Sequence, residues 1–184
     1  MNSESNEILS AFAQQIVRTI LDILGKDNID SIFMSGSVPR RRIASSAKAG
    51  VIEIYSDLDI YVTIKDSIGM ESSRNRVRRA VAKIPREGDG FKILPEPDVG
   101  VYSLDDFFAQ KARPGTVEIA SRHTVLFGNE ETPRRAEAFG VSDIDPTEAM
   151  YLLENRLSEI RELSSRVDAG GGADLVRFLR YTRL

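Results

Sequence analysis

Two aspartates alternate with apolar residues in the segment Ser56–Val62, and this alternation constrains the fold more than any other feature of the chain. Successive side chains of a β-strand point to opposite faces, so Asp57 and Asp59 would share one face of a strand. The opposite face would carry the apolar side chains of Leu58, Ile60, Val62 and Ile64. The segment therefore predicts a strand with a buried apolar face and a second face on which two carboxylates lie side by side.

Two adjacent carboxylates repel each other, and each raises the pKa of the other unless a cation lies between them. Magnesium meets that need, because one or two carboxylates can bind it while substrate phosphates complete its coordination shell. Upstream, the short apolar run Ser31–Ser35 leads into Gly36 and Ser37. A Gly-Ser turn offers backbone N–H groups and a hydroxyl to phosphate oxygens. The two elements together predict a site for a nucleoside triphosphate and Mg²⁺.

The composition bounds the class of protein. The chain has 184 residues, 41% hydrophobic and 29% charged, which is typical of a globular protein with one sizeable core. A net charge of −3 excludes a chain that is basic throughout, although it allows local basic patches. Because there is no cysteine and one histidine, disulfides, zinc thiolates, a thiol nucleophile and a multi-histidine metal site are all excluded.

No feature of the sequence indicates a signal peptide or a membrane-spanning segment. The N-terminus lacks the basic and apolar regions of a signal peptide, and no apolar run approaches the roughly 20 residues that span a bilayer. We therefore expect a cytoplasmic protein with no membrane partner.

The apolar periodicity predicts an α+β fold, with a small mixed sheet flanked by helices and a C-terminal helical segment. Helices are expected at about 7–24, 72–84 and 104–111, and from Asp145 onward, where Asp, Pro and Glu form a typical helix start. Strands are expected at about 31–35, 51–64, 91–102 and 124–127. We divide the chain into a domain at 1–144 and a helical segment at 145–184.

The motifs Phe33–Ser37 and Ser56–Ile60 resemble the signature of the DNA polymerase beta-type nucleotidyltransferase superfamily. That pattern is an apolar strand, Gly-Ser, a short helical turn, and a strand carrying Asp-x-Asp. The resemblance covers about residues 7–130. It implies that Asp57 and Asp59 hold two Mg²⁺ ions and that Gly36 and Ser37 position the phosphates of a nucleoside triphosphate, which we expect to be ATP.

The resemblance also implies a third acid on a neighbouring strand, which would complete the metal site and take a proton from the acceptor. Asp98 is the matching candidate, and Gly100 on the same strand face would leave space beside it. Glu96 lies two positions earlier on that face and is the rival candidate. The sequence leaves the choice between the two acids open.

The chain departs from the superfamily pattern between Ser37 and Asp57, because this gap is longer than in compact members. The extra residues, about 40–52, would form an insertion or an added hairpin. Arg40, with Arg41 and Arg42, would contact the triphosphate or a nucleic-acid backbone, or else belong to a solvated loop.

The resemblance implies a magnesium-dependent transferase that moves a nucleoside monophosphate from the triphosphate to an acceptor and releases pyrophosphate. The acceptor is not specified by the sequence, and a small-molecule hydroxyl, an RNA end and a protein side chain all remain open. The main alternative is a weak or inactive binding module, such as an antitoxin or a regulatory partner. A metal-dependent glycosyltransferase and an aspartyl-phosphate phosphatase fit the chain length and the order of the motifs less well.

Overall fold

The computed structural model describes residues 2–40, 43–65, 69–109, 116, 117, 119, 122–135 and 140–168. Arg41, Arg42, the predicted end of the helix at 104–111 and the predicted helical segment beyond residue 168 lie outside these residues. The described helices are α1 (Asn2–Leu24), η1 (Lys26–Asn28), α2 (Met70–Val81), α3 (Leu104–Phe108), α5 (Glu131–Arg134), η3 (Val141–Asp143) and α6 (Pro146–Asp168). The described strands are β1 (Ile29–Ser35), β2 (Ser45–Lys48), β3 (Val51–Ile54), β4 (Asp59–Ile64), β5 (Glu87–Gly88), β6 (Phe91–Ile93), β7 (Asp98–Ser103) and β8 (Thr124–Gly128).

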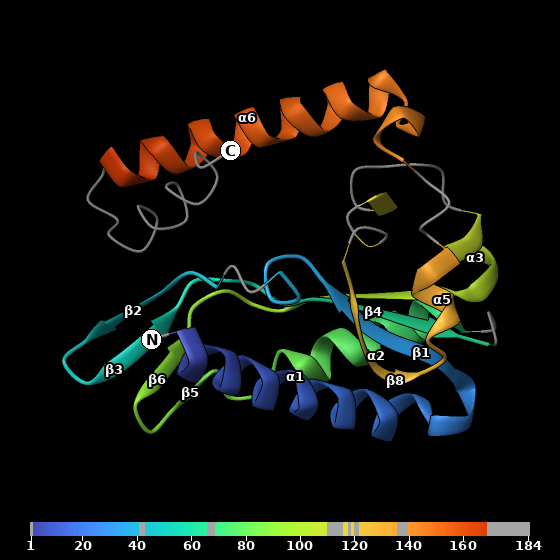
Figure 1. Ribbon diagram of the computed structural model, residues 1–184, viewed down its shortest axis with the longest axis horizontal. Helices are drawn as coiled ribbons and strands as arrows, with labels where there is room; N and C mark the ends of the chain where they lie inside the picture. Colours follow the sequence, from blue (N-terminus) through green and yellow to red (C-terminus); the bar gives the residue numbers. More distant parts are fainter. Residues whose placement is uncertain are drawn as a thin grey trace.

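The described strands form two mixed sheets of four strands each (Figure 1). The main sheet has the order β7-β4-β1-β8, with β1 antiparallel to both β4 and β8 and with β4 parallel to β7. The second sheet has the order β2-β3-β6-β5. The expected α+β class, with a small mixed sheet flanked by helices, is confirmed.

The core lies between one face of the main sheet and helices α1 and α2 (Figure 1). Alternate residues of β4 supply the sheet side of this core, and Ile60, Val62 and Ile64 are all buried, as the alternation predicts. The helices supply a stripe of buried apolar residues at spacings of three and four. This stripe consists of Leu9, Phe12, Ala13, Ile16, Val17 and Ile20 in α1 and Val77 and Val81 in α2.

The opposite face of the main sheet carries aromatic rings as well as polar side chains. Phe33 in β1 stacks on Tyr61 in β4, with ring centroids 5.4 Å apart and an interplanar angle of 8°. Tyr61 stacks in turn near Tyr102 in β7, at 6.3 Å and 19°. We call these three residues the aromatic row. It crosses the sheet beside the strand ends that carry the acids, and Phe107 of α3 closes it with edge contacts to Phe33 and Tyr102.

The predicted strand at 51–64 is wrong as a single element, because the chain changes sheets in its middle. β3 belongs to the second sheet and β4 to the main sheet, and residues 55–58 connect them. Hydrogen bonds to Ala44 fix this connection: the Ala44 N–H donates to Oγ of Ser56 at 2.8 Å, and the Tyr55 N–H donates to the Ala44 carbonyl at 2.8 Å. Asp57 therefore lies before β4 and not within it.

The predicted strand at 91–102 divides in the same way into β6 and β7. Pro95 and Pro97 lie between them and have no N–H to donate to a strand ladder, so the pairing is interrupted there. The extra residues after Ser37 form the hairpin of β2 and β3, antiparallel from Ser45↔Ile54 to Lys48↔Val51. The expectation of an added hairpin is thus confirmed.

Helix α5 and strand β4 are joined to β1 by a polar contact at Asp30, beside the core. Asp30 accepts hydrogen bonds from Oγ1 of Thr132 at 2.5 Å and from Oγ1 of Thr63 at 3.3 Å. A hydrogen bond to a carboxylate contributes about 2 kcal/mol, so we expect Thr132→Val to lower the free energy of unfolding by that amount. Urea denaturation measures the change. Thr19→Val, on an exposed turn of α1, is the control and should change the stability little.

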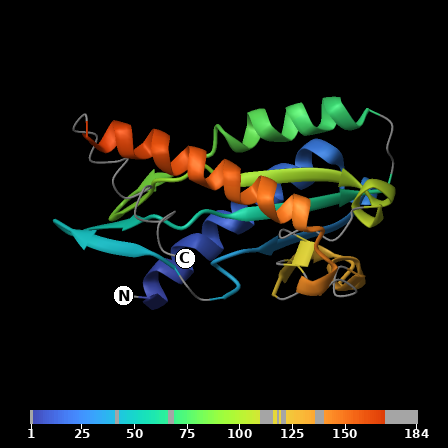
Figure 2. The same cartoon turned by 90° about the horizontal axis from the view of Figure 1, so that it is seen from above.

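Helix α6 begins where the sequence predicts, since the Thr147 N–H donates to Oδ1 of Asp145 at 2.8 Å. It runs across the molecule on the side opposite α1 (Figures 1 and 2). The apolar side chains of Met150, Leu153 and Leu157 are 54%, 47% and 44% exposed, so this stripe is not part of the core. No helix among the described residues is both long and apolar enough to cross a membrane.

Candidate functional site

Asp59 and Asp98 lie directly beside each other in the main sheet. Asp59 is the first residue of β4, Asp98 is the first residue of β7, and the two are register partners in this parallel pair. The Asp98 N–H donates to the Leu58 carbonyl at 2.8 Å, which fixes the register at this end. Partner residues of adjacent parallel strands present their side chains on the same face. The fold thus brings together two acids that are 39 positions apart in the sequence.

Gly36 approaches this pair from the end of β1. Ser35, the last residue of β1, is the antiparallel partner of Asp59, and Gly36 follows it with a φ of 84°. A Cβ atom placed on Gly36 would overlap Oδ2 of Asp59. The Asp59 carboxylate therefore occupies space that is open only because residue 36 has no side chain. A ligand bound to this carboxylate would also lie close to the Gly36 backbone.

Ser37 presents a hydroxyl that no protein group satisfies. Its Oγ is buried and has no hydrogen-bond partner among the described residues. A buried polar atom without a partner is costly unless a ligand or water supplies one. Gly36, Ser37 and Arg40 all belong to one turn, residues 36–40, so the three predicted phosphate-binding residues lie together on the chain.

Asp57 lies in the connection between the two sheets, two residues before Asp59. The intervening Leu58 is 2% exposed and packs in the core, whereas both aspartates are half-buried. The structure therefore shows the predicted pattern, with a buried apolar residue between two half-buried acids. Only Asp59 belongs to a strand and has its backbone held by strand pairing.

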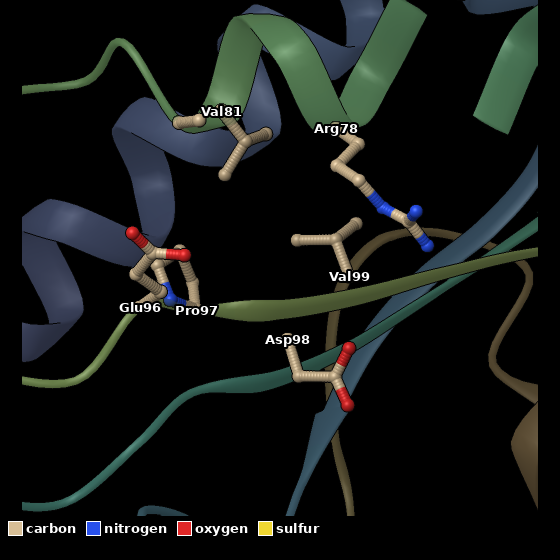
Figure 3. A pocket seen from close by; sticks show the side chains of 7 residues that line it. Arg78, Val81, Glu96, Pro97, Asp98 and Val99 are labelled. Carbon is tan, nitrogen blue, oxygen red and sulfur yellow. The ribbon is translucent and has the colours of Figure 1, made fainter. Parts of the chain in front are cut away.

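Glu96 lies apart from the acid pair. Its Oε1 forms an ion pair with Arg86 at 3.5 Å, and its side chain is 78% exposed. Figure 3 shows the carboxylates of Glu96 and Asp98 on opposite sides of the chain segment that carries them. The pocket in this view has a volume of about 300 Å³ and lies between α2 and the start of β7. It is lined by Arg78, Val81, Ala82, Glu96, Pro97, Asp98 and Val99.

The donor set fits a magnesium ion that is shared with a substrate. Asp59 and Asp98 supply carboxylate oxygens, which are the ligands that Mg²⁺ prefers, and Mg²⁺ commonly uses only one or two carboxylates together with phosphate oxygens. Within the described ranges, no three Asp, Glu, His or Cys side chains gather closely enough to hold an ion alone. The described acids therefore supply two carboxylates, which are fewer ligands than a cage made only of protein groups needs.

Tyr102 is a neighbour of the acid pair that the sequence interpretation missed. The space that Gly100 was expected to leave beside Asp98 is occupied, because the ring of Tyr102 lies over Gly100. Burial raises the pKa of the Tyr102 hydroxyl, the negative charge of Asp98 raises it further, and the positive charge of Arg74 acts in the opposite direction. The strand alternation that places positions 98, 100 and 102 on one face is the signal that could have revealed it.

Comparisons with known proteins complete the description of the site. No protein-family model and no curated protein sequence matches the chain. One similar solved structure is spectinomycin adenyltransferase AAD(9) from Enterococcus faecialis with ATP and spectinomycin, at 15% identity and a TM-score of 0.43, covering 88% of this chain and 69% of that chain.

Chains of toxin–antitoxin complexes are also similar. A toxin–antitoxin with AMP-PNP matches at 16% identity and a TM-score of 0.34, covering 82% of this chain and 98% of that chain. The tri-AMPylated Shewanella oneidensis HEPN toxin in complex with the MNT antitoxin matches at 16% identity and a TM-score of 0.33, covering 89% of this chain and 99% of that chain.

Proposed function

We propose that this protein is a magnesium-dependent nucleotidyltransferase that moves a nucleoside monophosphate from a nucleoside triphosphate, ATP in the first instance, to an acceptor. The observation that carries the proposal is the register of Asp59 with Asp98 beside Gly36 and the unpartnered hydroxyl of Ser37. Two carboxylates and a phosphate-binding turn at one end of a sheet are the groups that this chemistry requires.

In the proposed reaction, the acceptor oxygen forms a bond to the α-phosphorus of the triphosphate. The bond from that phosphorus to the bridging oxygen of the β-phosphate breaks, and pyrophosphate leaves with the electron pair. The proton of the acceptor passes to Asp98. Magnesium, which Asp59, Asp98 and the nearby Asp57 would hold, supplies positive charge that offsets the charge of the phosphates.

The turn at 36–40 has a separate role, which is to hold the phosphates that do not react. The Ser37 hydroxyl would donate to an oxygen of the β- or γ-phosphate, and the Gly36 backbone allows the triphosphate to approach the chain closely. Arg40 would add a positive charge at the end of the same turn. These contacts orient the leaving group in line with the acceptor.

The acceptor is the part of the reaction that the described residues specify least. A hydroxyl-bearing small molecule, an RNA end and a protein side chain each present an oxygen that Asp98 could deprotonate. Incubation with ATP labelled at the α-phosphate moves the label to the acceptor, while the pyrophosphate leaves unlabelled. The labelled product, a small molecule, an RNA or a protein, then identifies the acceptor class.

Two buried serines allow a test of the phosphate-binding turn. Ser37→Ala removes a hydroxyl without a protein partner, so we expect unchanged or slightly higher stability but an affinity for Mg·ATP that is lower by about tenfold. Ser31→Ala is the matched control, because its Oγ is also buried and unpartnered among the described residues but lies in the middle of β1. Calorimetric titration with Mg·ATP measures both, and equal affinities in the two variants would contradict the role of Ser37.

A second function, a regulatory or antitoxin-like module with little activity, is favoured by one observation. The described residues do not gather three acids into one ion site, and an incomplete site of this kind can bind a nucleotide without transferring it. This function predicts binding of Mg·ATP with no release of pyrophosphate. The measurement that separates the two functions is therefore the rate of pyrophosphate release by protein that is saturated with Mg·ATP.

A further inference from the structure

Tyr102 shares a face of β7 with the candidate acid Asp98, and Gly100 lies between them. A Cβ atom placed on Gly100 would lie 2.6 Å from Cε2 of Tyr102, 2.9 Å from its hydroxyl oxygen and 3.1 Å from Cζ. The Tyr102 ring therefore lies back along the strand over Gly100, in the direction of Asp98. Any side chain at position 100 would collide with the ring, so the placement depends on this glycine.

The aromatic row fixes the ring in this place. Tyr61 is the register partner of Gly100, and its ring stacks with Tyr102 at 6.3 Å and 19°. Phe107 of α3 contacts the same ring edge-on, at 6.2 Å and 61°. Since rings on three strands and one helix pack together, the direction of the Tyr102 hydroxyl is set by the fold and not by a flexible surface rotamer.

The Tyr102 hydroxyl has no hydrogen-bond partner among the described residues, although its ring makes several contacts. A tyrosine hydroxyl is protonated at neutral pH, so it can donate to an oxygen atom of a ligand. In the proposed function, the ligand oxygen nearest to Asp98 is that of the acceptor, because Asp98 takes its proton. The Tyr102 hydroxyl over Gly100 and the Asp98 carboxylate therefore present a neutral donor and an acceptor on one face of β7.

We propose that Tyr102 binds and orients the acceptor oxygen beside Asp98, so that the site accepts a hydroxyl group or water through one neutral donor and one carboxylate. This inference rests on the proposed function and adds a substrate-contacting residue to it. The acceptor proton still passes to Asp98, and Tyr102 keeps its own proton throughout.

Terbium luminescence tests the placement of Tyr102 without any acceptor. Tb³⁺ binds oxygen ligands, and it emits when a nearby tyrosine absorbs light and transfers the energy. The chain has five tyrosines and no tryptophan, so tyrosine is the only efficient antenna. We expect the wild-type protein to sensitise Tb³⁺ and Asp59→Asn to abolish the emission. Because Tyr61 lies on the same sheet face two positions after Asp59 and is a second antenna, Tyr102 is tested in a Tyr61→Phe background, where Tyr102→Phe should remove most of the remaining emission. Tyr151→Phe, on the exposed face of α6, is the matched control and should keep the emission.

The rate of pyrophosphate release from Mg·ATP, with water as the acceptor, tests the role of the hydroxyl. Tyr102→Phe keeps the ring but removes the donor, so we expect the rate to fall about tenfold while the affinity for Mg·ATP stays within twofold. If the hydroxyl had only a structural role, its removal would lower the stability and the affinity for Mg·ATP together. It would not lower the rate of pyrophosphate release while leaving the affinity unchanged.

The possible outcomes separate the inference from the proposed function. Emission that Asp59→Asn abolishes, but that does not fall when Tyr102→Phe is added to the Tyr61→Phe background, would overturn the placement of Tyr102 and leave the cation site standing. If Tyr102→Phe removes emission in the Tyr61→Phe background but leaves the rate of pyrophosphate release unchanged, the proposed role of the Tyr102 hydroxyl is overturned. If the wild-type protein gives no emission that depends on Asp59, the cation site fails, and both proposals fall together.

Discussion

Asp59→Asn is expected to lower the rate of pyrophosphate release from Mg·ATP on the order of 1000-fold and to leave the fold intact. The carboxylate of Asp59 lies over Gly36 and in register with Asp98, so it is the group most directly placed to hold a cation between protein and phosphates. Removing its charge would forfeit several kcal/mol of charge stabilisation in the transition state, which corresponds to that factor. Asparagine keeps the shape of the side chain, so the free energy of unfolding should change by less than about 1 kcal/mol.

The control for this variant is Asp89→Asn. Asp89 is exposed in the turn before β6, away from the strand ends that carry the site, and its amide variant should retain the full rate. Circular dichroism and urea denaturation establish that both variants are folded. Full activity in a folded Asp57→Asn/Asp59→Asn double variant would contradict the proposed role of these two carboxylates.

Gly36→Ala is expected to disturb the site in two separable ways. The φ of 84° at Gly36 is unfavourable for alanine and costs about 1–2 kcal/mol of stability. In addition, the new methyl group would overlap Oδ2 of Asp59 and displace the carboxylate. We therefore expect a moderately less stable protein whose affinity for Mg·ATP is lower by about 100-fold, since the metal ligand and the phosphate turn are both displaced.

Gly50→Ala separates these two effects. Gly50 has a similar φ of 80°, but a Cβ placed on it would meet no atom within 4 Å. The two variants should lose similar amounts of unfolding free energy, and only Gly36→Ala should lose binding. If both variants bind Mg·ATP as the wild type does, Asp59 does not hold the cation from the position that the structure gives it.

The local alternation of apolar and acidic residues was enough to predict which face of β4 is buried and which carries Asp59. It could not predict the change of sheet at residues 55–58, because this depends on hydrogen bonds between Ala44 and the residues Tyr55 and Ser56, which lie eleven and twelve positions further along the chain. The same alternation continues through the connection, so the segment reads as one strand until its partners are known.

The choice of the third acid shows what the pairing of strands reveals beyond the sequence. The motif resemblance gave Asp98 as the matching candidate, and Glu96, two positions earlier on the same strand face, was its rival. The register of β7 with β4 places only Asp98 beside Asp59, and the ion pair with Arg86 draws Glu96 to the other side. Strand alternation could have placed Tyr102 on the face of Asp98, but it could not predict that the ring lies over Gly100, because this results from stacking across strands that are distant in the sequence.

The most direct test of the central claim is a calorimetric titration of the folded protein with ATP, GTP, CTP and UTP, with and without Mg²⁺. The proposed function predicts that at least one triphosphate binds, that binding requires Mg²⁺, and that the Asp57→Asn/Asp59→Asn double variant loses it. If no triphosphate binds, or if binding is the same without Mg²⁺ and in the double variant, the aspartates at 57 and 59 and the turn at 36–40 do not form a nucleotidyltransferase site.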